Sequence, residues 1–172
     1  MRSTPIASLI LIISLWALSG LTSGLAHADL NGEIFKSAEW RVSLESPRGW
    51  QLSEDSSYPS ILLWMTHRRP DARMLFAAEI VDKSLDSQSY ALATAKKLEE
   101  LGFRVRAPQL HAATGAYWMD FDNGKSFLRQ AVLVPLDTET GYSLTLSASD
   151  NRTRGQLLRA FDLSLRSIRR KR

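Results

Sequence analysis

The chain has 172 residues, of which 22 are basic and 18 acidic, giving a formal net charge of +4, and it contains no cysteine. The absence of cysteine excludes thiol catalysis, thiolate metal sites, disulfide bonds and a lipid-modified N-terminal cysteine. A folded domain in this chain must therefore be stabilised by its core alone.

Residues 1–28 have the layout of a secretory signal peptide. Arg2 precedes the almost wholly apolar run Ile6–Leu18, and small residues lead to Ala26-His27-Ala28. We expect cleavage after Ala28 and export to the periplasm or the medium. The alternative is an uncleaved N-terminal anchor, although a bilayer span needs roughly 20 apolar residues. The length of residues 29–172 suits one domain.

Basic residues are concentrated at the C-terminus. Residues 151–172 contain eight basic residues and one acidic residue, Asp162. We interpret this segment as a basic C-terminal helix whose solvated end suits the negative end of the helix dipole. The alternative is weak contact with an anionic membrane surface or an acidic partner. Export argues against a nucleic-acid partner. The basic tail consists of Arg169, Arg170, Lys171 and Arg172.

The first predicted strand begins at Trp40 and places Trp40 and Leu44 on the same face. Pro47 and Gly49 end it, because proline lacks an amide donor and glycine permits a turn. We interpret this corner as structural, with Trp50 fixing it to the core. Contact of the two tryptophans with a ligand is the alternative.

Two central strands follow a polar loop at residues 54–60. Residues 61–65 are apolar at every position, which indicates a strand covered on both faces. Residues 73–81 also carry apolar side chains on both faces, and residues 67–71 form the turn between the two strands. Trp64 is expected in the core, with a binding role as the alternative.

The next predicted element is an amphipathic helix. Asp86 is one of several possible N-caps, apolar residues recur at helical spacing from Ala91 to Leu101, and Gly102 is a natural stop. Residues 103–106 are a short strand candidate.

Asn123-Gly124 lies between two alternating runs, which is a strong hairpin signal. A two-residue turn would pair Asp122 with Lys125 and Trp118 with Arg129. The second pair would stack as a cation–π contact. A further alternating strand at residues 142–148 and a last amphipathic helix complete the chain. We therefore predict an α+β fold, a mainly antiparallel sheet flanked by two or more helices.

The opening stretch "WRVSLESPRGW" resembles the start of the PsbP/Mog1/DcrB-like superfamily. The segments "SLDSQSYALATAKKLEELG" and "ATGAYWMDFDNGKSFLRQAVLV" are similar in order to the helix and hairpin that follow in that family. The resemblance covers about residues 34–168. It implies an α/β/α sandwich and an accessory, assembly or binding role. The lipid-attachment cysteine of many exported members is missing here, which favours a soluble protein.

No catalytic or metal site is predicted. His27 leaves with the signal peptide, and His67 and His111 lie in predicted loops without ligand spacing, whereas zinc needs three or four ligands. A calcium loop starting at Asp120 would need glutamate where Ala131 stands. The nucleophile elbow Gly-x-Ser-x-Gly is absent. We therefore expect no cofactor.

The remaining site candidates are Trp64, Trp118 and Arg129, as binding residues. We predict an exported, soluble, non-enzymatic accessory or binding protein of the bacterial cell envelope, with a protein partner there. One alternative is a binder of a small apolar ligand or lipid in a groove between sheet and helix. A second alternative is a cryptic hydrolase.

Overall fold

The computed structural model describes residues 30–54, 60–124, 126–136, 138–149 and 151–170. The predicted signal peptide, Lys171 and Arg172 lie outside these residues. In chain order the elements are β1 (Leu30–Ser37), β2 (Val42–Pro47), β3 (Gln51–Ser53), β4 (Ile61–Arg68), β5 (Asp71–Ile80), α2 (Ser87–Glu100), β6 (Arg104–Val105), β7 (Gln109–His111), β8 (Ala116–Asp122), β9 (Phe127–Leu133), β10 (Thr140–Ala148), the 3₁₀ helix η2 (Asn151–Thr153), α3 (Arg154–Ser167) and β11 (Arg169–Arg170).

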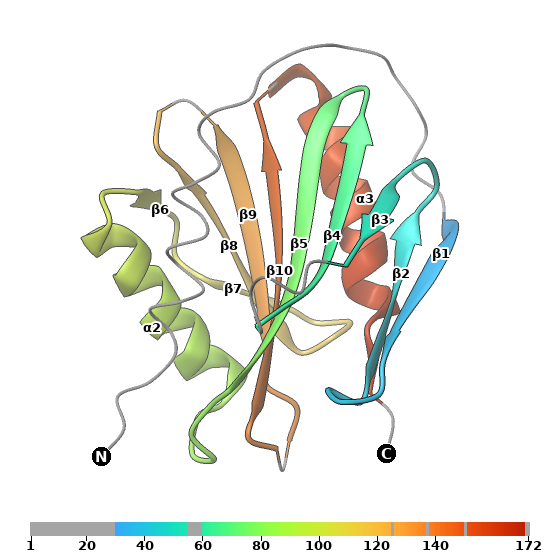
Figure 1. The fold of residues 1–172 in the computed structure, drawn as a ribbon. Coiled ribbons are helices and arrows are strands. Elements are labelled where there is room, and N and C mark those ends of the chain that lie inside the picture. Colours follow the sequence, from blue (N-terminus) through green and yellow to red (C-terminus); the bar gives the residue numbers. More distant parts are fainter. Residues whose placement is uncertain (1–29, 55–59, 125, 137, 150, 171–172) are drawn as a thin grey trace.

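The strands form two antiparallel sheets (Figure 1). The larger sheet has eight strands in the order β3-β4-β5-β10-β9-β8-β6, with β7 also paired to β8. The smaller sheet has the order β1-β2-β11. The prediction of a mainly antiparallel sheet is confirmed.

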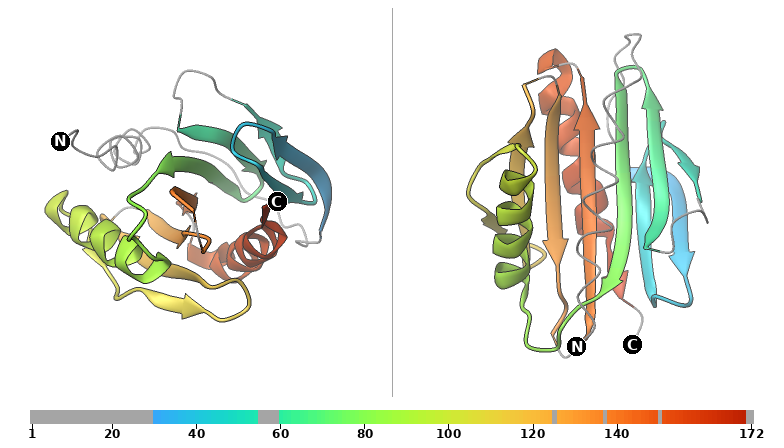
Figure 2. Two further views of the ribbon diagram at one scale, coloured as in Figure 1. Left: turned by 90° about the horizontal axis from the view of Figure 1, so that it is seen from below. Right: turned by 60° about the vertical axis from the view of Figure 1, so that its left-hand side comes forward.

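The two helices lie on opposite faces of the larger sheet (Figure 2). Helix α2 packs on β8 and β9, while α3 packs on β10 and on β2 of the smaller sheet. Together these layers form an α/β/α sandwich. Neither helix, nor any other described helix, is long and apolar enough to cross a membrane.

The central strands are buried on both faces. Strands β5 and β10 are buried at most positions, as the continuous apolar runs predict. The core on the α3 side includes Leu44, Phe76 and Leu144, and the core on the α2 side includes Leu98 and Phe121. Apolar burial on both faces of the sheet is the main source of stability for a chain without cysteine.

The start of the first predicted strand is wrong. Strand β2 begins at Val42, whereas Trp40 lies in the turn that joins β1 to β2. Strand β1 was not predicted, and its pairing of Ser37 with Val42 forces residues 38–41 to reverse the chain. Arg41 takes a positive φ of 50° there, a conformation that costs a residue with a side chain about 1–2 kcal/mol.

The Pro47–Trp50 corner is a tight turn. The Trp50 amide donates to the Pro47 carbonyl at 3.2 Å, and Gly49 has φ +80°. Trp50 is buried, and its ring packs on the ring of His67. Strand β4 extends to Arg68, so His67 lies in this strand and not in the predicted turn.

The β8–β9 hairpin has a different register from the predicted one. Asp122 pairs with Phe127 and Trp118 with Ala131, so the connection has four residues. Its turn is held by side chains: Asp122 Oδ1 accepts from the Gly124 amide at 3.0 Å, and Asn123 Oδ1 from the Ser126 amide at 3.1 Å. These Asx contacts compete with a two-residue turn.

The basic segment does not extend the last helix. Helix α3 ends at Ser167, and Arg169 and Arg170 form strand β11 against Ser43 and Val42 of β2. The guanidinium of Arg169 nevertheless donates to backbone carbonyls at the helix end, those of residues 166 and 168. A cation therefore lies at the negative end of the helix, as expected, but from the strand that follows it.

Candidate functional site

A groove lies at the end of the sheet where the β9–β10 loop, the start of α2 and the β7–β8 turn meet, at the lower end in Figure 1. Its first hollow has a volume of about 500 Å³. The walls are mainly apolar, and we call this hollow the apolar arm. Its apolar side chains come from Tyr117, Leu133, Val134, Pro135, Leu136 and Ile168.

A second hollow of about 400 Å³ adjoins the apolar arm. It lies between the β1–β2 turn and the start of β10, and we call it the polar arm. Tyr142 and Arg170 line both hollows, so the two arms meet at these residues. We refer to the whole as the Tyr142 groove. The polar arm is further lined by Glu39, Trp40, Arg41, Ile80 and Thr140.

Tyr142 fixes the floor of the groove. Its ring is buried and stacks on Phe76 at 6.1 Å between centroids. Its hydroxyl donates to the Trp40 carbonyl at 2.8 Å, which ties β10 to the β1–β2 turn. Burial raises the pKa of the Tyr142 phenol, while the nearby positive charge of Arg170 acts to lower it. The phenol therefore remains a neutral hydrogen-bond donor.

Two arginines line the polar arm: Arg170 at its junction with the apolar arm, and Arg41. Arg170 in β11 pairs with Val42 in β2, and Arg41 is the residue just before Val42. Both side chains are exposed, and neither forms an ion pair with any residue that the structure describes. Arg41 also keeps its positive φ here, and such strain often occurs at functional sites.

Two other polar residues of the groove, Asp86 and Ser87, are engaged in folding. Asp86 caps α2 by accepting from the Ser89 amide at 2.7 Å, and Ser87 Oγ exchanges hydrogen bonds with the Val134 backbone. A nucleophile needs a free base within hydrogen-bond reach, and these contacts leave no such pair among the described groove residues.

Trp118 and Arg129, two of the predicted binding residues, lie together on the α3 side of the sheet. The Arg129 guanidinium stacks over the Trp118 ring at 3.9 Å and binds Asp120 through two hydrogen bonds of 2.6 and 2.9 Å. Arg154 of α3 reaches the same carboxylate at 3.0 Å. This cluster joins α3 to the sheet, and none of its residues lines the Tyr142 groove.

Trp64, the third predicted binding residue, lies apart from these two. It is half-buried in β4, beside Ile61 and Leu75. The structure therefore does not gather the three into one site. The structure describes two residues of the basic tail: Arg170 lines the Tyr142 groove, and Arg169 contacts the helix end.

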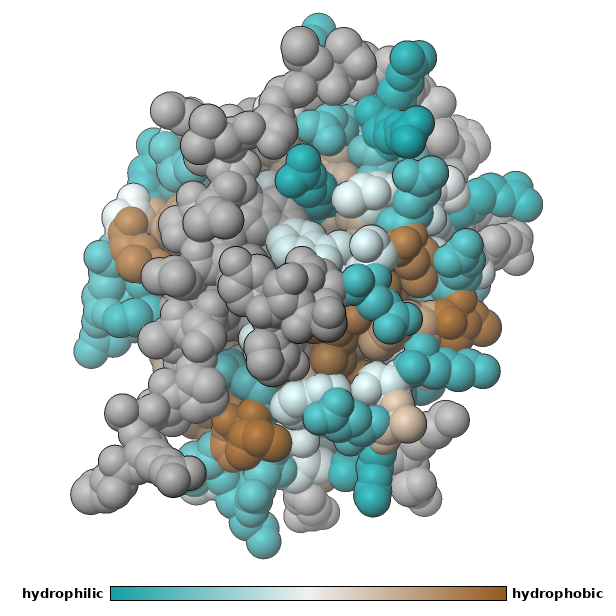
Figure 3. Space-filling model, in the orientation of Figure 1, coloured by the Kyte–Doolittle hydropathy of each residue, from teal (hydrophilic) through white to brown (hydrophobic). Residues whose placement is uncertain are grey.

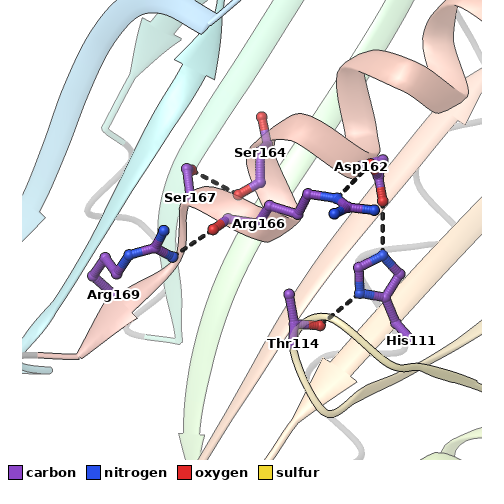
Figure 4. A network of polar contacts seen from close by, with 7 residues as sticks. All are labelled: His111, Thr114, Asp162, Ser164, Arg166, Ser167 and Arg169. Carbon is purple, nitrogen blue, oxygen red and sulfur yellow. Dashed lines mark hydrogen bonds and ion pairs between the residues drawn. The ribbon is translucent and has the colours of Figure 1, made fainter.

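A polar network surrounds the end of α3 (Figure 4). His111 of β7 contacts Asp162 through Nε2 at 2.7 Å and Thr114 through Nδ1 at 2.8 Å, and Asp162 also accepts from Arg166. His111 is the last residue of strand β7, whereas the sequence predicted a loop there. Across the described residues, no three His, Asp or Glu side chains are grouped so that they could hold a metal ion.

Sequence reasoning missed the groove because its walls come from segments far apart in the chain, between Glu39 and Arg170. Tyr142 is 102 residues away from Trp40, its hydrogen-bond partner. A weak signal in the sequence was the apolar Leu136, which follows Pro135 in a loop. In the structure 88% of its surface is accessible. On the face that Figure 3 shows, outside the atoms drawn in grey, hydrophobic residues reach the surface as small separate groups.

The sequence by itself matches no protein-family model and no curated protein. Solved structures match by fold. The cyanobacterial PsbP (CyanoP) of Synechocystis sp. PCC 6803 has a TM-score of 0.58 at 11% identity, covering 90% of this chain and 99% of its own. The Ran-binding protein Mog1p of Saccharomyces cerevisiae has a TM-score of 0.58 at 8% identity, covering 82% and 96%.

A third similar structure is LpqN, involved in cell envelope biogenesis of Mycobacterium tuberculosis. Its TM-score is 0.55 at 16% identity, with 83% of this chain and 87% of that chain covered. At these identities the similarity establishes the fold alone. The chain therefore has the PsbP/Mog1-like fold, which confirms the predicted fold class.

Proposed function

Starting from the PsbP/Mog1-like fold and the Tyr142 groove, we propose that the chain is an exported, soluble, non-enzymatic binding protein of the bacterial cell envelope. In this proposal residues 1–28 are removed during export, and the domain binds a partner in the envelope through the groove. The observation that carries the proposal is the groove itself, with its apolar arm beside two arginines that lack an ion-pair partner among the described residues.

Two kinds of support favour a binding role. Asp86, Ser87 and the Tyr142 hydroxyl are used for folding, and none of them is arranged as a nucleophile with its base. By analogy of fold alone, Mog1p is described as a Ran-binding protein and LpqN as a protein of cell envelope biogenesis. The layout of residues 1–28 supports export.

Photo-crosslinking in living cells tests the groove. A photoreactive amino acid replaces Leu136 in one variant and Leu92 in the control, because both leucines are exposed but only Leu136 lines the groove. We expect a reproducible adduct with an envelope component at position 136 and none at position 92. Equal labelling at both positions, or no adduct at either, contradicts the proposal.

Export is tested separately. The protein that accumulates in cells is released by osmotic shock, and its intact mass is measured. We expect release with the periplasmic fraction and a mass that begins at Asp29. A full-length chain that stays with the membrane fraction would support the uncleaved-anchor alternative instead.

A further inference from the structure

We propose that the Tyr142 groove binds a fatty acid, with the carboxylate at Arg170 and Arg41 and the acyl chain in the apolar arm. This inference rests on the proposed binding function, because it assigns a ligand to the same groove. It gives a chemical reason for two features found side by side, an apolar hollow and a pair of arginines without ion-pair partners among the described residues.

The apolar arm suits a single hydrocarbon chain. Its volume of about 500 Å³ falls within the range of roughly 300–1,000 Å³ that small-molecule sites occupy. Leu133 and Ile168 are half-buried, and Leu136 is almost fully exposed, so an acyl chain between them would cover surface that water now contacts. Covering apolar surface is favourable by about 25 cal/mol per Å².

The charges at the junction of the arms suit an anionic head group. Arg170 lies close enough to the Tyr142 phenol to affect its pKa, which places the positive charge at the point where the apolar arm ends. Arginine binds carboxylates through two parallel hydrogen bonds. Two acidic residues also line the groove. Asp86 is engaged as the cap of α2, and Glu39 lines the polar arm together with the two arginines.

The alternative occupant is a segment of a partner protein. A peptide would bring backbone amide and carbonyl groups into the apolar arm, where they need hydrogen-bond partners. The backbone groups of Val134 are already bonded to Ser87. A hydrocarbon chain has no such requirement, and this difference favours the fatty acid.

The test uses the protein as it accumulates in cells and four probes of defined chemistry. Three share a ten-carbon chain: decanoate, decyl maltoside and decyltrimethylammonium, which are anionic, neutral and cationic. Acetate supplies the head group alone. Binding is followed by ¹H–¹⁵N shifts of the amides of residues 136, 142, 168 and 170. We expect decanoate to shift these amides at the lowest concentration, and acetate to shift none.

Matched variants test which residues bind the carboxylate and which bind the acyl chain. Arg170→Gln removes the head-group charge and Leu136→Asn the apolar contact, with Arg159→Gln and Leu92→Asn as exposed controls elsewhere. We expect Arg170→Gln to weaken decanoate about tenfold and to leave decyl maltoside unchanged, since a charge-assisted contact contributes about that factor. Leu136→Asn should weaken both.

Three results overturn the inference. Equal affinity for the three ten-carbon probes, or tighter binding of the cationic one, would show that the arginines do not bind the head group. Absence of shifts with decanoate would show that the groove does not bind a fatty acid. In that case a crosslinked protein at position 136 would still uphold the binding function, so the two proposals fail separately.

Discussion

The imidazole of His67 packs against the indole of Trp50, with 5.3 Å between the ring centroids. His67 Nδ1 lies 3.1 Å from the Pro70 carbonyl, which can only accept, so this nitrogen carries the proton. The other nitrogen, Nε2, faces Gly49, where a Cβ would stand 3.6 Å away. The corner that begins at Pro47 is thereby closed onto strand β4.

Trp50→Ala tests whether this corner is structural. The side chain is buried, so its removal should cost about 3–5 kcal/mol of unfolding free energy. Urea denaturation measures the loss, and Trp50→Phe is the control that keeps a ring against His67 and should lose less. An unchanged denaturation midpoint together with a lost crosslink at position 136 would make the corner functional instead.

The carboxylate of Asp120 joins α3 to the hairpin, and Asp120→Asn tests this role. Its side chain is only 7% exposed and binds both Arg129 and Arg154. Removing one charge from a buried pair leaves the other uncompensated and costs about 3–5 kcal/mol. Chemical denaturation measures this loss.

Asp122→Asn is the matched control, on the same strand. Asp122 also pairs with an arginine, Arg104, but there both side chains are well exposed. Exposed ion pairs contribute little to stability, so its loss should be much smaller. Equal losses in the two variants would show that burial of the Asp120 cluster has no energetic importance.

The Arg129–Trp118 contact shows how far the sequence could lead. The predicted register placed the two residues directly opposite each other, whereas the structure pairs Arg129 with Asp120, so the contact is diagonal. A shift of two residues keeps every side chain on the same face of the sheet, and the predicted stacking therefore survives the error. Local alternation determines the face, but the Asx contacts of the turn determine the register.

Features that depend on distant segments were not predictable in this way. Strand β1 carries a weak apolar pattern and is defined by its pairing with β2. Strand β11 exists because the chain leaving α3 meets the edge of β2 beside Ser43. The Tyr142 groove is lined by residues from Glu39 to Arg170, and no short window of the sequence contains them together.

Glu79 should make the protein less stable as the pH rises. Burial raises the pKa of this carboxyl above its ordinary value of 4.5, with an opposing effect from the Tyr90 hydroxyl, which donates to it. At pH values between 4.5 and the raised pKa, the folded state binds more protons than the unfolded chain. The free energy of unfolding therefore falls as the pH rises through that interval.

Glu79→Gln removes this titration while keeping an oxygen that accepts from Tyr90. We expect the variant to be more stable than the parent at pH 8, with a smaller difference at pH 4. Thermal melts across this range measure both, and Glu99→Gln on the exposed side of α2 is the control. A difference of the same size at both pH values would show that the Glu79 carboxyl is not the titrating group.

Gln130 should be replaceable with a gain in stability. Its side chain is fully buried in β9, and neither amide atom has a hydrogen-bond partner among the described residues. The residues opposite it are Met119 in β8 and Thr145 in β10. An unsatisfied buried amide costs about 1–3 kcal/mol, and methionine has a similar length without polar groups at its end.

We therefore expect Gln130→Met to raise the denaturation midpoint, by an amount set by that penalty. Gln88→Met is the matched control, because Gln88 is exposed at the start of α2 and should change little. A lower midpoint for Gln130→Met would mean that the amide is satisfied in solution, for which a buried water with two or more polar partners is the physical route. Thr145 lies opposite Gln130 and supplies a hydroxyl that can bind such a water. Thr145→Val, made in the parent chain, therefore separates an amide satisfied through a water, which loses stability, from an unsatisfied amide, which does not.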